Sequence, residues 1–335
     1  MRAGPCAAAA TAVLLLAGCG GSQNALAPKS HQAADIASLF WWMMGAAWIG
    51  LAVVVALLVV AWKRRARGAA AGGHDSKAGE RAGWYVVVGA GIALPIAVIA
   101  ALFVISDIFV IRTTQAPAAS ATRLTVQVVG HQWWWEIRYP GTRAVTANEL
   151  HIPVRTPVRV DVQTADVIHS FWVPALNRKV DAIPGRTNAI ELEADAVGSY
   201  RGQCAEFCGL QHAHMAMEVI ADPPARFRAW LAGQERPAQP PATAGARRGA
   251  DLFTSGACQS CHTIRGTSAA GTTGPDLTHV ATRRTLAANT IPNDPPHLRS
   301  WITDSQEVKP GNDMPNLDLS DAQLDALVTY LDNLR

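Results

Sequence analysis

Charged residues are scarce in this chain of 335 residues: Asp, Glu, Lys and Arg make up 16% of it, whereas apolar residues make up 49%. Such a composition indicates membrane-spanning segments joined to ordinary soluble domains. The formal net charge is only +3, and no run of basic residues carries interleaved aromatic side chains. Both features argue against a nucleic-acid partner. The length allows two or three domains.

Cysteine is also scarce, and each of the six cysteines has a separate expected role. Cys6 lies in an N-terminal leader and Cys19 at a processing site. The other four form two close pairs, Cys204 with Cys208 and Cys258 with Cys261. No cysteine is then left for a structural disulfide.

Residues 1–18 carry one positive charge and then a small-residue apolar run that is too short to span a bilayer. The run ends L-A-G-C at Cys19, which resembles a bacterial lipoprotein box. We therefore expect a lipoprotein signal peptide over residues 1–18 and a lipidated Cys19, with an ordinary or uncleaved leader as the alternative. Residues 19–38 are then an external segment.

Two long apolar runs, residues 39–62 and 84–110, predict a transmembrane hairpin within residues 39–112. At ~1.5 Å per residue the first run is about 36 Å long, enough to cross a hydrocarbon core of ~30 Å. Tryptophans mark both of its ends, and the basic stretch 63–67 follows it. Basic loops stay in the cytoplasm, so both chain termini are expected outside.

Residues 204–215, C-A-E-F-C-G-L-Q-H-A-H-M, concentrate soft and borderline metal ligands. Thiolate together with thioether favours copper, and two cysteines four positions apart can bridge two metals. A structural zinc site or a disulfide is the alternative, but zinc sites do not recruit methionine. His169, in an apolar stretch typical of a strand, is the candidate for a further ligand. The alternative is an ordinary core histidine.

Residues 123–222 contain short β-rich runs divided by Pro and Gly, at Leu124–Val129, Pro157–Gln163, Thr187–Glu193 and Met217–Ile220. Runs of this spacing predict an antiparallel β-sandwich. Residues 233–246, rich in Pro, Ala and Gly, are typical of a semi-extended linker.

A further domain is expected over residues 247–335. Its signature C-Q-S-C-H, from Cys258 to His262, is a C-x-x-C-H haem-attachment motif. Cys258 and Cys261 would form thioether bonds to haem c, and His262 would supply an axial nitrogen. A redox C-x-x-C is the rival interpretation.

The sequences G-P-D-L at 274–277 and N-D-M-P at 312–315 resemble a class I cytochrome c, as does the closing amphipathic segment. Met314 is the only methionine after Met217, so it is the expected second axial ligand. His279 or His297 could replace it only if the domain departs from that pattern.

Three stretches together resemble subunit II of cytochrome c oxidase, which carries the mixed-valence copper centre CuA. They read D-V-I-H-S-F-W-V-P-A-L from Asp166, D-A-I-P-G-R from Asp181 and G-Q-C-A-E-F-C-G-L-Q-H-A-H-M from Gly202. The resemblance covers roughly residues 30–222. It implies a multidomain chain: a two-helix transmembrane hairpin, a cupredoxin-like β-sandwich and then an all-α class I cytochrome c domain.

The resemblance also implies the copper ligands, which are His169, Cys204, Cys208, His212, Met215 and the main-chain carbonyl of Glu206. The carboxylate of Glu206 is implied to help hold magnesium at the interface with subunit I. His214 is expected to be a bystander.

Residues 130–136, G-H-Q-W-W-W-E, contain three consecutive tryptophans that cannot all face one core, because strand neighbours alternate sides. Either Trp134 points inward, or two of the three pack and one lies under a loop. The family motif G-H-Q-W-x-W implies that Trp133 is the point where electrons enter.

The chain as a whole therefore resembles subunit II of a caa-type haem–copper oxidase with a fused cytochrome c domain. The resemblance implies that electrons pass from an external cytochrome c or its reductase to haem c, then to CuA and to subunit I. There oxygen is reduced to water and protons are pumped, so this chain holds no catalytic residue. Subunits I and III are the implied partners, and a bacterial inner membrane, crossed twice, is the implied location.

Two rival functions differ from this one. A quinol oxidase subunit II would share the fold but lack the copper ligands at Cys204, Cys208, His212 and Met215. A free-standing electron carrier for another reductase would not dock on subunit I.

Overall fold

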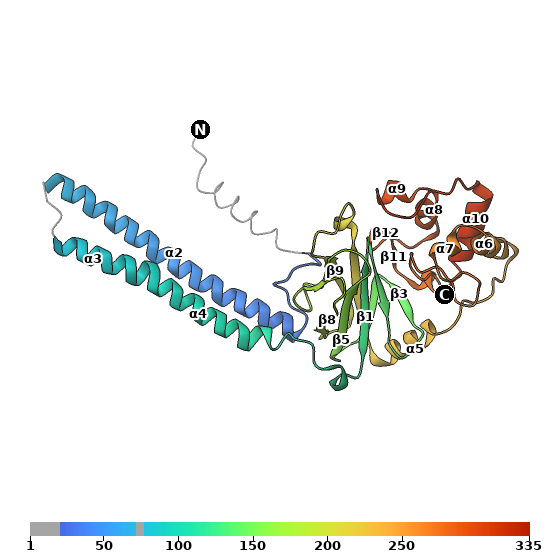
Figure 1. Ribbon diagram of the computed structural model, residues 1–335, viewed down its shortest axis with the longest axis horizontal. Helices are drawn as coiled ribbons and strands as arrows, with labels where there is room; N and C mark the ends of the chain where they lie inside the picture. Colours follow the sequence, from blue (N-terminus) through green and yellow to red (C-terminus); the bar gives the residue numbers. More distant parts are fainter. Residues whose placement is uncertain (1–20, 72–76) are drawn as a thin grey trace, which may run out of the picture. The chain divides into compact units, whose positions relative to one another are not determined.

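The computed structural model describes residues 21–71 and 77–335, so the expected signal peptide and Cys19 lie outside the described residues. The chain divides into two compact units (Figure 1). Residues 34–114 form the helical unit. Of the described residues, 21–33 and 115–335 form the other unit.

The helical unit is built from two long apolar segments. Its elements are α2 (His31–Ala71), α3 (Lys77–Val88), the π-helical turn η2 (Gly89–Ala93), α4 (Leu94–Ser106) and the π-helical turn η3 (Asp107–Ile111). The stretches His31–Arg65 and Gly83–Ile111 are long and apolar enough to cross a membrane. The expected spans, residues 39–62 and 84–110, lie inside these two stretches.

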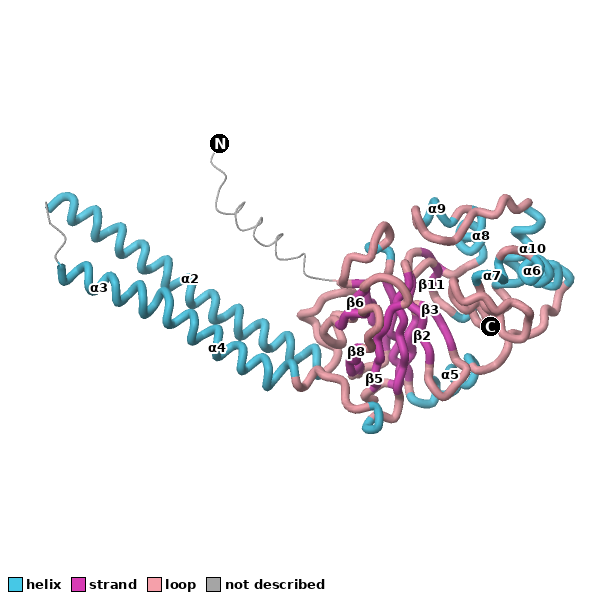
Figure 2. The backbone as a smooth tube through the Cα atoms, in the orientation of Figure 1, coloured by secondary structure: helices cyan, strands magenta, loops and turns pink. Residues whose placement is uncertain are grey.

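The second unit begins with a β-sandwich, as expected. Its strands are β1 (Thr125–His131), β2 (Trp134–Arg138), β3 (Val145–Ala147), β4 (Glu149–Pro153), β5 (Val158–Thr164), β6 (His169–Trp172), β7 (Val180–Ala182), β8 (Asn188–Leu192), β9 (Gly198–Cys204) and β10 (Ala216–Asp222). One sheet has the order β3-β2-β1-β5-β8 and the other β4-β10-β9-β6-β7. Figure 2 draws the strands in magenta.

Strand pairing departs from the expected antiparallel pattern at two places. β1 pairs with β5, and β10 with β4, in parallel. Strands that are far apart in sequence can pair in either direction, and apolar alternation is the same for both. Alternate side chains of β1, β5 and β8 fill the core between the sheets, including Val126, Val128, Val158, Val160, Val162, Ile190 and Leu192.

After the sandwich, α5 (Pro224–Gln234) packs its Trp230 ring against His151, with the ring centroids 3.9 Å apart. A short connection, residues 235–243, leads to the C-terminal domain. Its main chain is tied to that domain where the N–H of Ala238 donates to the carbonyl of Arg265 at 2.9 Å.

The C-terminal domain is mainly helical around its own apolar core. Its elements are α6 (Ala244–Ser255), α7 (Cys258–Cys261), the 3-10 turn η6 (Val280–Thr282), the short ladder of β11 (Thr285–Leu286) with β12 (Ile291–Pro292), α8 (Pro295–Thr303), α9 (Ser305–Val308) and α10 (Asp321–Leu331). α6 and α10 pack so closely at Gly249 that an added Cβ would lie 2.0 Å from the carbonyl oxygen of Ala326.

Candidate metal centres

The loop that joins β9 to β10 holds most of the expected copper ligands. Cys204 ends β9 and Met215 immediately precedes β10, and the N–H of Cys204 donates to the carbonyl of Met215 at 2.9 Å. The antiparallel ladder therefore closes the base of the loop. His169 begins β6, which pairs with β9, so a residue distant in sequence is brought to the same end of the sheet.

The donor atoms of all six expected ligands converge in this loop. The Sγ atoms of Cys204 and Cys208 are 3.8 Å apart. The other separations are 3.9 Å from His169 Nδ1 to Cys204 Sγ, 3.3 Å from Cys204 Sγ to the Glu206 carbonyl oxygen, 3.6 Å from Cys208 Sγ to His212 Nδ1 and 3.8 Å from Cys208 Sγ to Met215 Sδ. His214 is exposed and bonds to Gln211 instead.

The chemistry of this donor set fits a pair of copper ions. Two thiolates, two imidazoles and a thioether are the soft and borderline ligands that copper prefers. His169, Cys204, Cys208 and Met215 are buried. A buried site with this many protein donors leaves little room for water or substrate, which suits electron transfer rather than bond chemistry.

The pKa values of the two thiols shift in opposite directions because the thiols share a hydrogen bond. This bond to Cys208 is the main reason why the pKa of Cys204 lies far below its ordinary value, although burial opposes the shift. The same bond, together with burial, raises the pKa of Cys208. Cys204 is therefore the thiol that ionises first.

Neighbouring residues fix the orientation of the His169 ring. Its Nε2 bonds to Oδ1 of Asp166 at 2.7 Å, which leaves Nδ1 facing Cys204. An added Cβ at Gly130 would lie 2.8 Å from Cδ2 of His169, so glycine is needed there. Burial alone would raise the pKa of Asp166, but hydrogen bonds from His169 and from main-chain N–H groups bring it below its ordinary value. The sequence analysis did not single out Asp166.

Two of the three tryptophans pack in the interior, as in the second expected arrangement, but the third, Trp134, lies on β2 and was not placed correctly by either expectation. Trp133 and Trp135 are buried, whereas Trp134 is half-buried and stacks on His131 with ring centroids 4.3 Å apart. The Nε1–H of Trp133 donates to the carbonyl of Cys208 at 2.9 Å. Trp133 is therefore attached directly to the copper loop.

Glu206, between the two cysteines of the loop, is half-buried. Its carboxylate is 3.6 Å from Nζ of Lys179, which in turn lies 3.7 Å from Asp181. Phe207 and Leu210 are strongly exposed, with 77% and 79% of their surface accessible.

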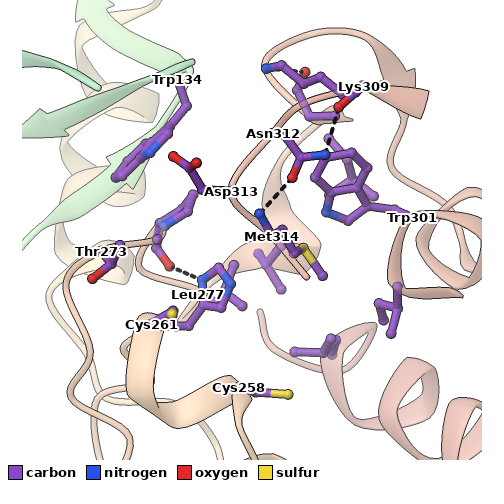
Figure 3. A pocket seen from close by; sticks show the side chains of 18 of the residues that line it. Trp134, Cys258, Cys261, Thr273, Leu277, Trp301, Lys309, Asn312, Asp313 and Met314 are labelled. Carbon is purple, nitrogen blue, oxygen red and sulfur yellow. Dashed lines mark hydrogen bonds between the residues drawn. The ribbon is translucent and has the colours of Figure 1, made fainter. Parts of the chain in front are cut away.

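A cavity of about 250 Å³ lies in the C-terminal domain where that domain meets the sandwich, and Trp133 and Trp134 also line it (Figure 3). Cys258, Cys261, His262 and Met314 line it, together with apolar side chains such as Phe253, Leu277 and Leu298. His279 and His297, the alternative axial ligands, are not among its lining residues. They bond instead to the carbonyl of Arg236 and to Asp294.

The orientation of the His262 ring is fixed in a way that suits an axial haem ligand. Its Nδ1 donates to the carbonyl of Pro275 at 2.9 Å, which leaves Nε2 available to iron. An added Cβ at Gly274 would lie 2.5 Å from Cε1 of His262. Burial lowers the pKa of His262, which favours the neutral ring that binds metals. Arg283 also lines the cavity, and its buried Nε has no hydrogen-bond partner among the described residues.

The sandwich and the C-terminal domain are in contact within their compact unit. The main-chain N–H of Arg284 donates to Glu149, and the Arg284 guanidinium lies 3.2 Å from Glu218. Burial raises the pKa of Glu149 to about 7, although that N–H and the charge of Arg283 oppose the shift. Sequence reasoning did not identify Glu149, because its partner is distant in sequence.

Both domains match families of known proteins. Residues 142–221 match the family described as cytochrome c oxidase subunit II, periplasmic domain, and residues 246–335 match the cytochrome c family. The sandwich thus matches a subunit II domain, and the C-terminal domain matches a cytochrome c domain. The first implies copper and the second haem, and the two apolar helices fit a membrane protein with these domains outside.

Similar proteins from bacteria carry the name cytochrome c oxidase subunit 2. The chain is 36% identical over 220 residues to cytochrome c oxidase subunit 2 of Alkalihalophilus pseudofirmus, which covers 65% of this chain and 64% of that protein. It is 31% identical over 223 residues to the subunit 2 of Bacillus sp. strain PS3, covering 63% and 62%. The match thus spans less than two thirds of these relatives. A solved subunit II periplasmic domain of Bradyrhizobium japonicum is 34% identical, covers 34% of this chain and 94% of that one, and has a TM-score of 0.33.

Proposed function

We propose that the chain is subunit II of a respiratory haem–copper cytochrome c oxidase and relays electrons without itself performing bond chemistry. It accepts electrons from an external cytochrome c or its reductase at the cytochrome c domain and passes them through the subunit II domain to subunit I. Oxygen is reduced to water there, with proton pumping. The observation that carries the proposal is the pair of thiols of Cys204 and Cys208, 3.8 Å apart among further soft donors, in the same compact unit as a C-x-x-C-H cavity.

The copper ligands in this proposal are His169, Cys204, Cys208, His212, Met215 and the carbonyl of Glu206. Copper shared between two thiolates supplies one-electron exchange with little change in bond lengths. The protein keeps the ligands still, because β6, β9 and β10 hold three of them at the ends of paired strands. The Asp166 carboxylate adds an outer contact that fixes one imidazole.

The haem ligands in this proposal are His262 and Met314, with covalent attachment through Cys258 and Cys261. Methionine opposite histidine raises the potential of a haem, which suits a donor to copper. The cavity offers apolar walls for the ring, and the buried, unpaired Nε of Arg283 suits a haem carboxylate.

Trp133 is the proposed point where electrons enter the copper loop. It lines the haem cavity and also donates its Nε1–H to the carbonyl of Cys208. In this chain, therefore, the donor to Trp133 is the chain's own haem.

The remaining assignments follow from the same proposal. Glu206, beside Lys179, would help to hold magnesium at the interface with subunit I. Subunit III completes the assembly, in a bacterial inner membrane crossed by the helices of the hairpin. Cys19 is proposed as the lipidated N-terminus after removal of residues 1–18.

The test is to purify the full chain from its native membrane and to determine its metals and its partners. Two coppers per haem c, with an electron paramagnetic resonance spectrum of one electron shared by two coppers, are expected, together with a large haem-containing membrane subunit. One copper, or zinc, would contradict the binuclear site. Intact metals without such a partner would favour the free-standing carrier.

A further inference from the structure

Lys309 is a buried lysine without an acidic partner, on the loop that carries the haem methionine. It directly follows α9 and precedes Met314 by five residues, and only 3% of it is exposed. Its Nζ donates to the carbonyl of Trp133 at 2.6 Å and to that of Ala287 at 3.5 Å. Among the described residues, its Nζ hydrogen bonds go to main-chain carbonyls and not to a carboxylate.

Holding an ammonium in this place is unfavourable. Burial lowers the pKa of Lys309 to about 7, which means that the surroundings oppose its charge. Hydrogen bonds to two carbonyls and the charge of Cys208 offset only part of this cost of burial. Lys309 thus links its own loop to two segments that are distant in sequence, at Trp133 and Ala287.

Lys309 is the middle member of a chain of hydrogen bonds between the two metal-binding loops. On the haem side, the Nδ2 group of Asn312 donates to the Lys309 carbonyl at 2.7 Å, and Asn312 Oδ1 accepts from the N–H of Met314 at 2.8 Å (Figure 3). On the copper side, Trp133 accepts from Lys309 and donates to the Cys208 carbonyl at 2.9 Å.

The residues that follow Lys309 touch the copper loop as well. Nε2 of Gln211 donates to the carbonyl of Pro310. An added Cβ at Gly311 would lie 2.7 Å from Cδ1 of Leu210, so the two loops are in direct contact at this point. The loop of the haem ligand and the loop of the copper ligands thus form one continuous contact.

We propose that Lys309 is a positioning residue for electron transfer from haem to copper: its ammonium holds the Met314 loop against Trp133 and so fixes the separation of the two centres. The proposal rests on the proposed function above. According to this proposal, the rate of electron transfer from haem to copper depends on the buried contact between the Met314 loop and Trp133. It does not depend on the surface of the subunit II domain.

The experiment uses the full chain in its purified complex. A light-activated reductant injects one electron at the haem, and absorbance follows haem reoxidation and copper reduction. K309M removes the donor but keeps the length, K309Q keeps a donor without the charge, and K29M replaces an exposed lysine of the same compact unit as a control.

We expect K309M to slow the haem-to-copper step at least tenfold, with haem content, copper content and both spectra unchanged. K309Q is expected to recover at least half of the loss in the logarithm of this rate. K29M is expected to have the same rate as the wild type. A fully loaded K309M with the wild-type rate would overturn the proposal. Absence of haem-to-copper transfer in the wild type would instead refute the proposed function.

A second variant tests the proposal if K309M fails to bind copper or haem. Q211A removes the contact with Pro310, together with the bond between Gln211 and His214, and leaves Lys309 in place. We expect it to slow the same step at least threefold. An unchanged rate in fully loaded Q211A would then show that the contact between the loops does not position the centres.

Discussion

The Sγ atoms of Cys204 and Cys208 lie 3.8 Å apart in the loop between β9 and β10, with both cysteines free. This separation is far longer than the 2.03–2.05 Å of a disulfide bond. Both cysteines are buried, and in the proposed function each sulfur would be shared by two copper ions. The pair, rather than either thiol alone, defines the site.

Replacing Cys208 by serine tests this relationship directly. The hydroxyl is a much poorer ligand for copper than a thiolate, so C208S is expected to bind at most one copper per chain in place of two. The measurement is the copper-to-haem ratio with the electron paramagnetic resonance spectrum, and the haem content serves as the internal control. Two coppers with an unchanged spectrum in C208S would rule out thiolate bridging.

Removing the charge of Asp166 should weaken copper binding without removing a ligand. Its carboxylate bonds to Nε2 of His169 at 2.7 Å, and loss of such an outer contact typically weakens metal binding about 10–100-fold. We expect D166N to fall in this range when copper is titrated against a competing chelator. D195N, at an exposed aspartate of the same domain, is the control. Equal affinities in D166N and D195N would show that Asp166 does not support His169.

The buried carboxyl of Glu149 should make the stability of the chain depend on pH. Its folded pKa is about 7, whereas its ordinary value is 4.5, so the folded state holds a proton that the unfolded state has lost between these values. The free energy of unfolding should therefore fall by up to about 3 kcal/mol as the pH rises from 4.5 through 7, and then level off.

The variant E149Q cannot ionise and should lose this decrease. The measurement is the free energy of unfolding of the full chain in detergent at a series of pH values between 5 and 8. E235Q, at an exposed glutamate, should keep the wild-type slope. Parallel curves for E149Q and the wild type would mean that Glu149 is not the titrating group.

Two glycines of α6 provide a matched pair for the packing of the cytochrome c domain. In G249A the new methyl group would meet the Ala326 carbonyl of α10, so we expect a loss of about 3 kcal/mol or haem-binding failure. In G245A the nearest atom, on Thr329, is 3.7 Å away, and alanine should stabilise the helix by up to about 1 kcal/mol. Haem absorbance during denaturant unfolding measures both. Similar stabilities would contradict the close contact of α6 with α10.

Local sequence patterns predicted the elements that carry the sites. β1, β5, β8 and β10 lie within one or two residues of the expected strands, because each is a short run of β-branched and other apolar residues. The donors in the loop from Cys204 to Met215 could be named from their spacing alone, and the comparisons place this loop in a subunit II domain. The individual ligand assignments remain predictions.

Contacts between distant segments could not be predicted in this way. The parallel pairing of β1 with β5 depends on which strands meet in space. Lys309 and Glu149 look like ordinary charged residues in the sequence, and they acquire their properties only when the two domains bury them. The choice of Trp134 as the half-buried tryptophan likewise follows from the strand register, in which Trp135 opposes Gly130.

The short connection of residues 235–243 between α5 and α6 has a consequence for respiration at low donor abundance. A tether of this length keeps the two domains that it joins at an effective concentration on the order of millimolar. Under the proposed function, the step from haem to copper is therefore independent of the concentration of any soluble carrier. The supply of donor would then set only the rate at which the haem is reduced again.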